Sequence, residues 1–266
     1  MANTIADKLT YLSGTKDAIK QAIIGKGVEV TDTDTFRSYA DKIEAIQTGG
    51  GGGTGSLVAG TKLAYSTFST IPDEYISYLE SQNSMYNMFC NCVLLQTVPL
   101  FDTNKCTSMN STFKNCEALE TVPAFNTVNV TTMNSTFSGC RSLITVSPFD
   151  TNRVTDMSAT FYFCEALETV PAFNTSNVTY IDNIFSRCSS LTNIGGFTGL
   201  KQNLDLTDSP KLTIESIVNI ITTAANMSSS PRTLTLHSDV FDKLSQEQIA
   251  TATAKGWNIA SEWNIE

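Results

Sequence analysis

Cysteine is the residue type whose spacing most suggests chemistry in this sequence. Five of the seven cysteines recur at a constant 24-residue interval: Cys92, Cys116, Cys140, Cys164 and Cys188. Such a series could be a metal array or a set of disulfides, but zinc sites use short Cys-x₂-Cys pairs instead. Cys90 and Cys106 lie outside the series, and Cys90-Asn-Cys92 lacks metal-ligand spacing. We therefore predict buried structural thiols and no metal. Because seven is an odd number and leaves one cysteine unpaired, assembly in a reducing compartment is also expected.

Other residues that could support catalysis or cofactor binding are few. Histidine occurs once, as His237 at the end of an alternating Thr-Leu-Thr-Leu-His run, which favours a structural residue without a catalytic role. Gly49 to Gly55 is rich in glycine but lacks the Lys-Ser/Thr of a phosphate loop, so it is read as a linker. We expect no cofactor, and an enzyme is the least favoured class of function.

One aromatic pair, Tyr162-Phe163 before Cys164, stands where comparable positions are polar or small. The pairs directly before Cys116, Cys140 and Cys188 are Lys114-Asn115, Ser138-Gly139 and Ser186-Arg187. An exposed aromatic pair can form a contact point for a sugar or a protein. We therefore predict Tyr162 and Phe163 as receptor-contact residues, with an ordinary repeat residue as the alternative.

Composition limits the possible partners. The chain carries 17 basic and 26 acidic side chains, a net charge of -9, whereas duplex binding needs a basic face. The acidic excess is typical of a soluble protein, and no nucleic acid is expected. No run approaches the ~20 apolar residues of a membrane span, so no membrane insertion is expected either. The start, Met1 to Leu12, does not read as a secretory signal peptide.

The strongest pattern in the chain is an internal 24-residue repeat. One repeat reads M-x-x-x-F-x-x-C-x-x-L-x-x-V-x-x-F-[DN]-T-x-x-V-T. Two of its apolar columns are phenylalanine: Phe89, Phe113, Phe137, Phe161 and Phe185, then Phe101, Phe125, Phe149, Phe173 and Phe197. One such unit encloses no core of its own, so the repeats must stack with like residue on like residue.

The repeat also predicts the parts of each coil. The Leu-x-x-Val piece, such as Leu119 to Val122, is expected to be a strand that pairs in parallel with its neighbours. The Phe-[Asp/Asn]-Thr corner suits a tight turn, because Asp and Asn side chains bond nearby backbone N–H groups. Residues Met133 to Phe137 and their equivalents are expected to form a short helical or 3₁₀ return leg.

The flanks differ in composition from the repeat. Helical spacing near the N-terminus predicts three short helices whose apolar positions are Ile5, Leu9, Leu12, Ile19, Ile23, Phe36, Tyr39 and Ile43. So small a module needs a partner or self-association, and we predict these residues for docking. Beyond the repeat we expect strands at Leu204 to Leu206 and Leu234 to Leu236. A helix opens at Thr213 with Ile214, Ile217, Val218 and Ile221 on one face, and a closing helix runs from the Ser245–Gln248 capping box to Gly256.

The chain is thereby divided into five segments. They are a helical anchoring or oligomerisation module (1–48), a Gly-rich linker (49–56), an N-terminal cap (57–83), five coils (84–203) and a C-terminal cap (204–266).

The repeat resembles a known family. Phe149 to Met157, which reads FDTNRVTDM, and Phe173 to Thr179, which reads FNTSNVT, are similar to the BspA-like or DUF285-type leucine-rich repeats. The resemblance covers residues 84–200 and implies an α+β repeat fold: a leucine-rich-repeat-type solenoid of 24-residue coils with a small helical N-terminal module and an α/β C-terminal cap. Such repeats occur in bacterial surface proteins and phage structural proteins. Tyrosine is common at the position of Tyr162.

The N-terminal flank resembles the first segment of many phage virion proteins. The similarity runs from Thr4 to Leu12, through Lys16 to Ile23, to Thr35 to Ile43, while Leu212 to Ser216 and Thr253 to Trp257 resemble a cap found in such phages. It implies a head or tail fibre that docks to other virion proteins, forms a trimer, and contacts a host surface glycan or protein. A bacterial cell-surface adhesin is the alternative.

Overall fold

Residues 62–266 form one compact unit, of which the computed structural model describes residues 63–263. The predicted helical module (1–48) and the linker (49–56) lie outside the described residues. So do the residues predicted for docking: Ile5, Leu9, Leu12, Ile19, Ile23, Phe36, Tyr39 and Ile43. These assignments stay predictions.

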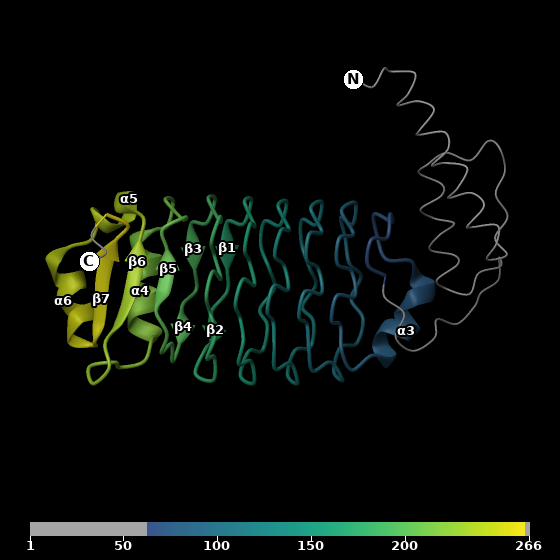
Figure 1. The fold of residues 1–266 in the computed structure, drawn as a ribbon, viewed down its shortest axis with the longest axis horizontal. Helices are drawn as coiled ribbons and strands as arrows, with labels where there is room; N and C mark the ends of the chain where they lie inside the picture. Colours follow the sequence, from purple (N-terminus) through teal and green to yellow (C-terminus); the bar gives the residue numbers. More distant parts are fainter. Residues whose placement is uncertain (1–62, 264–266) are drawn as a thin grey trace, which may run out of the picture. The chain divides into compact units, whose positions relative to one another are not determined.

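Successive 24-residue segments wind into coils that lie side by side (Figure 1). Parallel bridges join Ser108 to Thr132, Thr132 to Asp156, and Asp156 to Tyr180, so each coil is offset from the next by one repeat. The register of the coils is therefore the register of the sequence pattern.

Short parallel strands join the last coils. β1 (Thr169–Val170) pairs with β3 (Asn193–Ile194), and β2 (Phe173–Asn174) pairs with β4 (Phe197–Thr198). The predicted parallel strand in the Leu-x-x-Val piece is confirmed in the last coils, where β1 and β3 end at Val170 and Ile194, but Leu119 to Val122 belong to no strand. The Glu120 N–H donates to the Gln96 carbonyl of the preceding coil at 3.4 Å, a longer bond than the 3.0 Å from the Gly195 N–H to the Val170 carbonyl beside β1 and β3.

The leg that carries the Met-x-x-x-Phe piece is a series of turns, so the prediction of a helical or 3₁₀ leg at 133–137 is wrong. The N–H groups of Met109, Ser111, Phe113 and Asn115 donate to carbonyls of the next coil at 2.7 to 3.0 Å, while those of Thr112, Lys114 and Cys116 bond within their own coil. Positive φ angles, 54° at Ser111 and 58° at Asn115, turn alternate N–H groups toward the next coil. In a helix these N–H groups would bond to carbonyls of the same segment and could not join the next coil.

The Phe-[Asp/Asn]-Thr corner is a tight turn, as predicted. The side-chain oxygens of Asp102, Asp150 and Asn174 each accept from the N–H two residues further on, at 2.9 to 3.0 Å. The threonine that follows points inward and donates to a carbonyl of the next coil, as Thr127 does to Asp150 at 2.9 Å. The corner thus closes each coil and also joins it to its neighbour.

Two ladders of phenylalanine fill the interior. Phe89, Phe113, Phe137, Phe161 and Phe185 are fully buried, with consecutive ring centroids 5.3 to 5.6 Å apart and ring planes within 10° of parallel. The second ladder packs against the first, for example Phe149 on Phe137 at 5.8 Å. Offset-stacked rings gain more than their buried area alone gives.

Helices and a three-stranded sheet close the two ends. At the first coil, η1 (Asp73–Tyr75) leads into α3 (Ile76–Ser81), which buries Tyr78 and Leu79. At the other end, the parallel strands follow the order β5 (Leu204–Leu206), β6 (Arg232–Leu236) and β7 (Trp257–Ser261). The sequence predicted β5 and most of β6 but missed β7, whose first residue directly follows Gly256.

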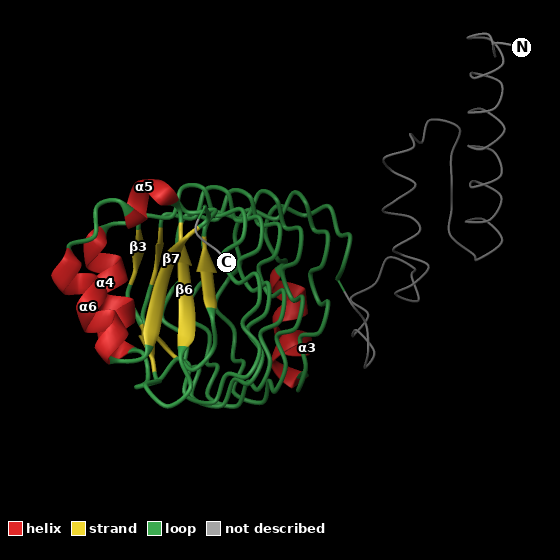
Figure 2. Cartoon of the chain, turned by 60° about the vertical axis from the view of Figure 1, so that its left-hand side comes forward, coloured by secondary structure: helices red, strands yellow, loops and turns green. Residues whose placement is uncertain are grey.

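Three helices flank these C-terminal strands. They are α4 (Ile214–Thr223), α5 (Ser238–Phe241) and α6 (Gln246–Ala254). Figure 2 shows α4 and α6 near one another, where α4 contacts β3 and β4 and α6 contacts β7. The predicted helix start at Thr213, where the structure adds a side-chain N-cap, and the predicted Ser245–Gln248 capping box are confirmed. Val218 is not on the buried face, because Ile217, Ile220 and Ile221 occupy it.

Within residues 63–263, no helix combines the length and apolar character that crossing a bilayer requires.

Replacement of one ring of the inner ladder tests the packing. Phe137 is fully buried between Phe113 and Phe161, so Phe137→Ala should lower the free energy of unfolding by about 3–5 kcal/mol in urea denaturation. Val128→Ala, at a side chain that is 45% exposed, is the control and should change it by no more than about 0.5 kcal/mol. A loss below about 1 kcal/mol for Phe137→Ala would contradict the packing described.

Candidate functional site

The predicted contact pair Tyr162–Phe163 lies in two columns of outward positions on the turn leg. One column holds Cys90, Lys114, Ser138, Tyr162 and Ser186, and the next holds Asn91, Asn115, Gly139, Phe163 and Arg187. Every residue of the second column has a positive φ, from 58° to 78°. The left-handed backbone at this column lets its N–H reach the next coil, as Asn115 donates to Ser138 and Gly139 to Tyr162 at 2.7 Å. The side chains in these columns are free to vary.

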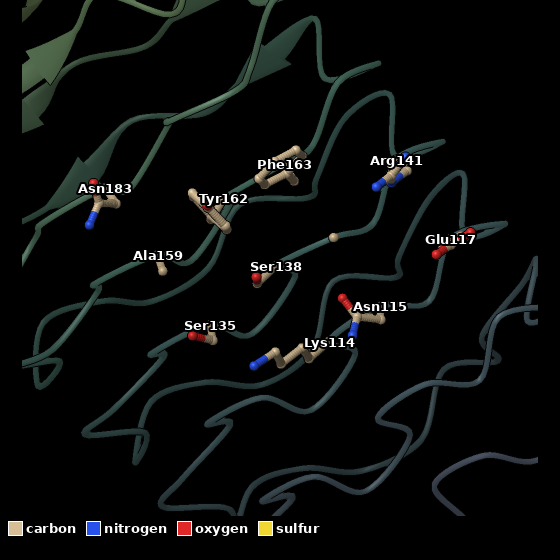
Figure 3. A pocket seen from close by; sticks show the side chains of 11 residues that line it. Lys114, Asn115, Glu117, Ser135, Ser138, Arg141, Ala159, Tyr162, Phe163 and Asn183 are labelled. Carbon is tan, nitrogen blue, oxygen red and sulfur yellow. The ribbon is translucent and has the colours of Figure 1, made fainter.

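A hollow of about 470 Å³ opens in this face (Figure 3). It is lined by Lys114, Asn115, Glu117, Ser135, Ser138, Gly139, Arg141, Ala159, Tyr162, Phe163 and Asn183. The lining comes from neighbouring coils, with Tyr162 and Phe163 on one wall and Lys114 and Asn115 on the other. The sequence-predicted pair is therefore one wall of a cavity that the sequence did not reveal.

The hollow exists because one coil carries small residues in both columns. Ser138 and Gly139 form the floor between the two walls. Gly139 has φ +78°, and a Cβ there would overlap the Asn115 side-chain oxygen. A side chain at this position would therefore require the Asn115 side chain to move.

Two polar groups face the hollow from its floor and wall. The Asn115 Nδ2 donates to Asn91 Oδ1 at 2.8 Å, which turns the Asn115 Oδ1 toward Gly139. Ser138 is only 5% exposed, yet its hydroxyl makes no hydrogen bond to any residue that the structure describes. Every fully enclosed side-chain oxygen in residues 63–263 has a partner, so the Ser138 hydroxyl is not fully enclosed, and Ser138 lines the hollow. A hydroxyl without a protein partner is available to a ligand or to water.

Among the described residues, the cations near the aromatic wall lie against Phe163 and not against Tyr162. Tyr162 and Phe163 meet edge to face, with centroids 4.6 Å apart at 81°. The guanidinium carbons of Arg141 and Arg187 each lie 5.8 Å from the centre of the Phe163 ring, within cation–π range. Tyr162 keeps 36% of its surface exposed. The aromatic face that remains open to a ligand is therefore that of Tyr162.

The Cys column is buried beside the phenylalanine ladder. From Cys116 onward each Sγ donates to the carbonyl of a phenylalanine in the preceding coil, as Cys140 does to Phe113 at 3.0 Å and Cys164 to Phe137 at 3.1 Å. Burial raises the pKa of the Cys140, Cys164 and Cys188 thiols above the ordinary value. Thiols in this state are protonated and poorly reactive, which agrees with the prediction of structural residues. Residues 63–263 contain no group of three or more His, Cys, Asp or Glu placed to hold a metal ion.

His237 acts at a helix start. Its Nδ1 accepts from the Asp239 N–H at 3.1 Å and so caps α5, and its Nε2 lies 3.9 Å from the Glu262 carboxylate. The sequence predicted a structural role for this residue but missed the capping bond. The histidine lies in the C-terminal strands and helices and does not line the hollow.

Sequence reasoning missed most of the site. Lys114, Asn115, Ser138 and Gly139 were identified only as repeat variants, and Arg141 was not identified at all. The available signal was the Ser138–Gly139 pair itself, because small residues in both columns of one coil must leave a gap between larger neighbours. Periodicity shows which positions are equivalent, but it does not show which variable positions face a common space.

In comparison with known proteins, a family model matches the region of the coils. Residues 83–196 match the model of a family described as a Mycoplasma protein of unknown function, DUF285. The predicted DUF285-type, BspA-like resemblance is thereby confirmed for this part of the chain, which is less than half of its length. No curated protein matches the chain. The resemblance of the N-terminal segment to phage proteins stays a prediction.

The buried thiols predict a pH dependence of stability. Because their folded pKa is raised, the folded protein keeps these protons while the unfolded chain releases them above about pH 8.5. The free energy of unfolding should be insensitive to these groups at pH 7 and fall above about pH 8.5, by up to about 1.4 kcal/mol per pH unit for each thiol.

The comparison with Cys140→Ala isolates one thiol. Urea denaturation between pH 7 and 10 should show a shallower decline for Cys140→Ala than for the parent, whatever the variant's stability at pH 7. Parallel curves would mean that Cys140 titrates alike in the folded and unfolded protein.

Proposed function

We propose that this protein is a bacteriophage virion structural protein, a head or tail fibre that docks through its N-terminal helices and displays a repeat solenoid for contact with a host surface glycan or protein. The observation that carries the contact role is the hollow beside Tyr162, whose lining holds an open aromatic face and the Ser138 hydroxyl, which has no partner among the described residues. Ligand sites of this kind combine apolar walls with a few polar groups.

The proposal also includes the fold class of the repeat region. We take residues 84–203 as a leucine-rich-repeat-type solenoid with caps at both ends. The support is the 24-residue offset of the bridges and the parallel rings of the phenylalanine ladder. Stacked coils offer an extended surface on which columns of outward side chains can vary without changing the core.

A binding role is favoured over catalysis. Among residues 63–263, the lining of the hollow includes one carboxylate, Glu117, and no histidine. Glycoside hydrolysis, the reaction that would suit a glycan contact, needs two carboxyl groups flanking the bond. Turnover of a glycan by the purified protein would reverse this choice.

The anchoring role is assigned to residues 1–48. Its support is the resemblance of Thr4 to Leu12 and Thr35 to Ile43 to phage virion segments, together with the glycine-rich stretch Gly49 to Gly53. A flexible linker lets an anchor and a display unit work separately. We propose other virion proteins and further copies of this chain, as a trimer, as the partners, with assembly in the host cytoplasm.

A second candidate is a bacterial cell-surface adhesin. It is favoured by the family description, since Mycoplasma are cells and residues 83–196 match that family. The neighbouring genes distinguish the two candidates, because capsid or tail genes beside this one favour the virion role.

Removal of the open aromatic ring tests the contact site. Tyr162→Ala should weaken binding of the full chain to host cells at least tenfold, because the apolar wall of the hollow is lost. Tyr180→Ala is a matched control, since Tyr180 is 61% exposed and lies outside the hollow, and it should bind as the parent does. Equal binding by both variants in flow cytometry would show that the contact lies elsewhere.

Deletion of residues 1–48 tests the anchor. The truncated protein should be absent from purified particles, because the docking helices are gone, while the intact chain copurifies with them. Immunoblotting of gradient-purified virions measures both. Truncated protein that still copurifies with the particles would refute the anchoring role.

A further inference from the structure

We propose that the hollow beside Tyr162 binds a sugar that carries a carboxylate, so that the receptor is an acidic glycan. The inference rests on the proposed contact function and specifies its ligand. It is carried by three features of the hollow: paired hydrogen-bonding groups, one open aromatic face, and cations gathered in an acidic chain.

The hydrogen-bonding groups suit a hydroxyl of a sugar. Asn115 Oδ1 faces the hollow as an acceptor, because its amide nitrogen is committed to Asn91 at 2.8 Å. The Ser138 hydroxyl, on a residue that is 5% exposed and without a partner among the described residues, can donate. A sugar hydroxyl both donates and accepts, so it can bond to either group.

The aromatic wall suits the C–H face of a sugar ring. Arg141 and Arg187 already lie against Phe163, each with its guanidinium carbon 5.8 Å from the ring centre. Tyr162 is held edge to face on Phe163, and the residue is 36% exposed. An amphipathic ring of this kind packs apolar atoms on its face while its hydroxyl stays in water.

The charged side chains that line the hollow favour an acidic sugar over a neutral one. The chain has a net charge of -9, yet Lys114 and Arg141 line the hollow against one carboxylate, Glu117. Lys114 makes no ion pair within residues 63–263, and the contact of Arg141 with Glu165 is long, at 3.8 Å, and about half exposed on both sides. Both cations are therefore available to a ligand carboxylate, which the guanidinium fork fits well.

The remaining carboxylate limits the charge of the ligand. Glu117 would repel the second charge of a phosphate or a densely sulfated sugar, because like charges are disfavoured at short range. A singly charged carboxylate meets two cations, Lys114 and Arg141, against the one carboxylate of Glu117, so attraction outweighs repulsion. This separates a uronic or sialic acid from the more strongly charged alternatives.

The test compares each acidic sugar with its neutral methyl ester. The probes are galacturonate oligosaccharides and sialyllactose, each with its methyl ester, titrated into the full chain by calorimetry. We expect the free acids to bind and the esters to bind at least tenfold more weakly. Arg141→Gln should reduce acid binding at least tenfold, and Tyr162→Ala should reduce binding of acid and ester alike.

Lys105→Gln is the matched charge control. Lys105 is exposed on the turn after Phe101, outside the hollow, so its loss removes one charge without touching the site. It should leave affinity within twofold of the parent. Thermal unfolding of every variant shows whether a lost affinity comes from a lost fold.

The other outcomes separate this inference from the proposed function. Equal binding of acid and ester, with Arg141→Gln unaffected and Tyr162→Ala impaired, would overturn the acidic sugar and keep the contact site. Binding to host cells that protease treatment of the cells abolishes, without binding to any sugar, would make the receptor a protein. Absence of binding to sugars and to cells would overturn both.

Discussion

Each coil depends on its neighbours, because one 24-residue coil cannot enclose a core of its own. The stacked phenylalanine rings show how the dependence is met: Phe113, Phe137 and Phe161 are fully buried only because the coils above and below cover their faces. This constraint fixes the spacing of the coils and the repeat length, since a ladder breaks if one coil slips by a residue. The polar backbone, the turns and the variable outer columns all have to fit that spacing.

The backbone of the coils satisfies its hydrogen-bonding groups without long strands or helices. Alternate N–H groups along the leg point to the next coil, and the threonine hydroxyls inside, such as Thr136 and Thr160, bond carbonyls of their own and of the preceding coil. As a result, no fully enclosed side-chain nitrogen or oxygen among the described residues lacks a partner. Left-handed residues at regular positions make this possible, because they turn the chain while presenting their N–H outward.

The hollow is a local departure from the repeat that leaves the core unchanged. Phe137 and Cys140 stay fully buried in the coil that carries Ser138 and Gly139. A binding site can therefore arise from substitutions in the outer columns alone, without cost to the ladders beneath. In a stacked architecture the inner residues specify the fold, and differences between outer residues specify what it contacts.

The sequence alone determined the repeat length, the buried columns and the helix caps at Thr213 and Ser245, because periodic burial and capping depend on residues near one another or on strict spacing. The Leu-x-x-Val strand that it predicted occurs only in the last coils, as β1 and β3, and the helical leg at 133–137 is absent, because its N–H groups bond to the next coil. Only the tertiary structure decided that Lys114, Ser138 and Tyr162 share one hollow. Residues one repeat apart become neighbours through stacking, and the gap between them depends on side-chain volumes in three coils at once.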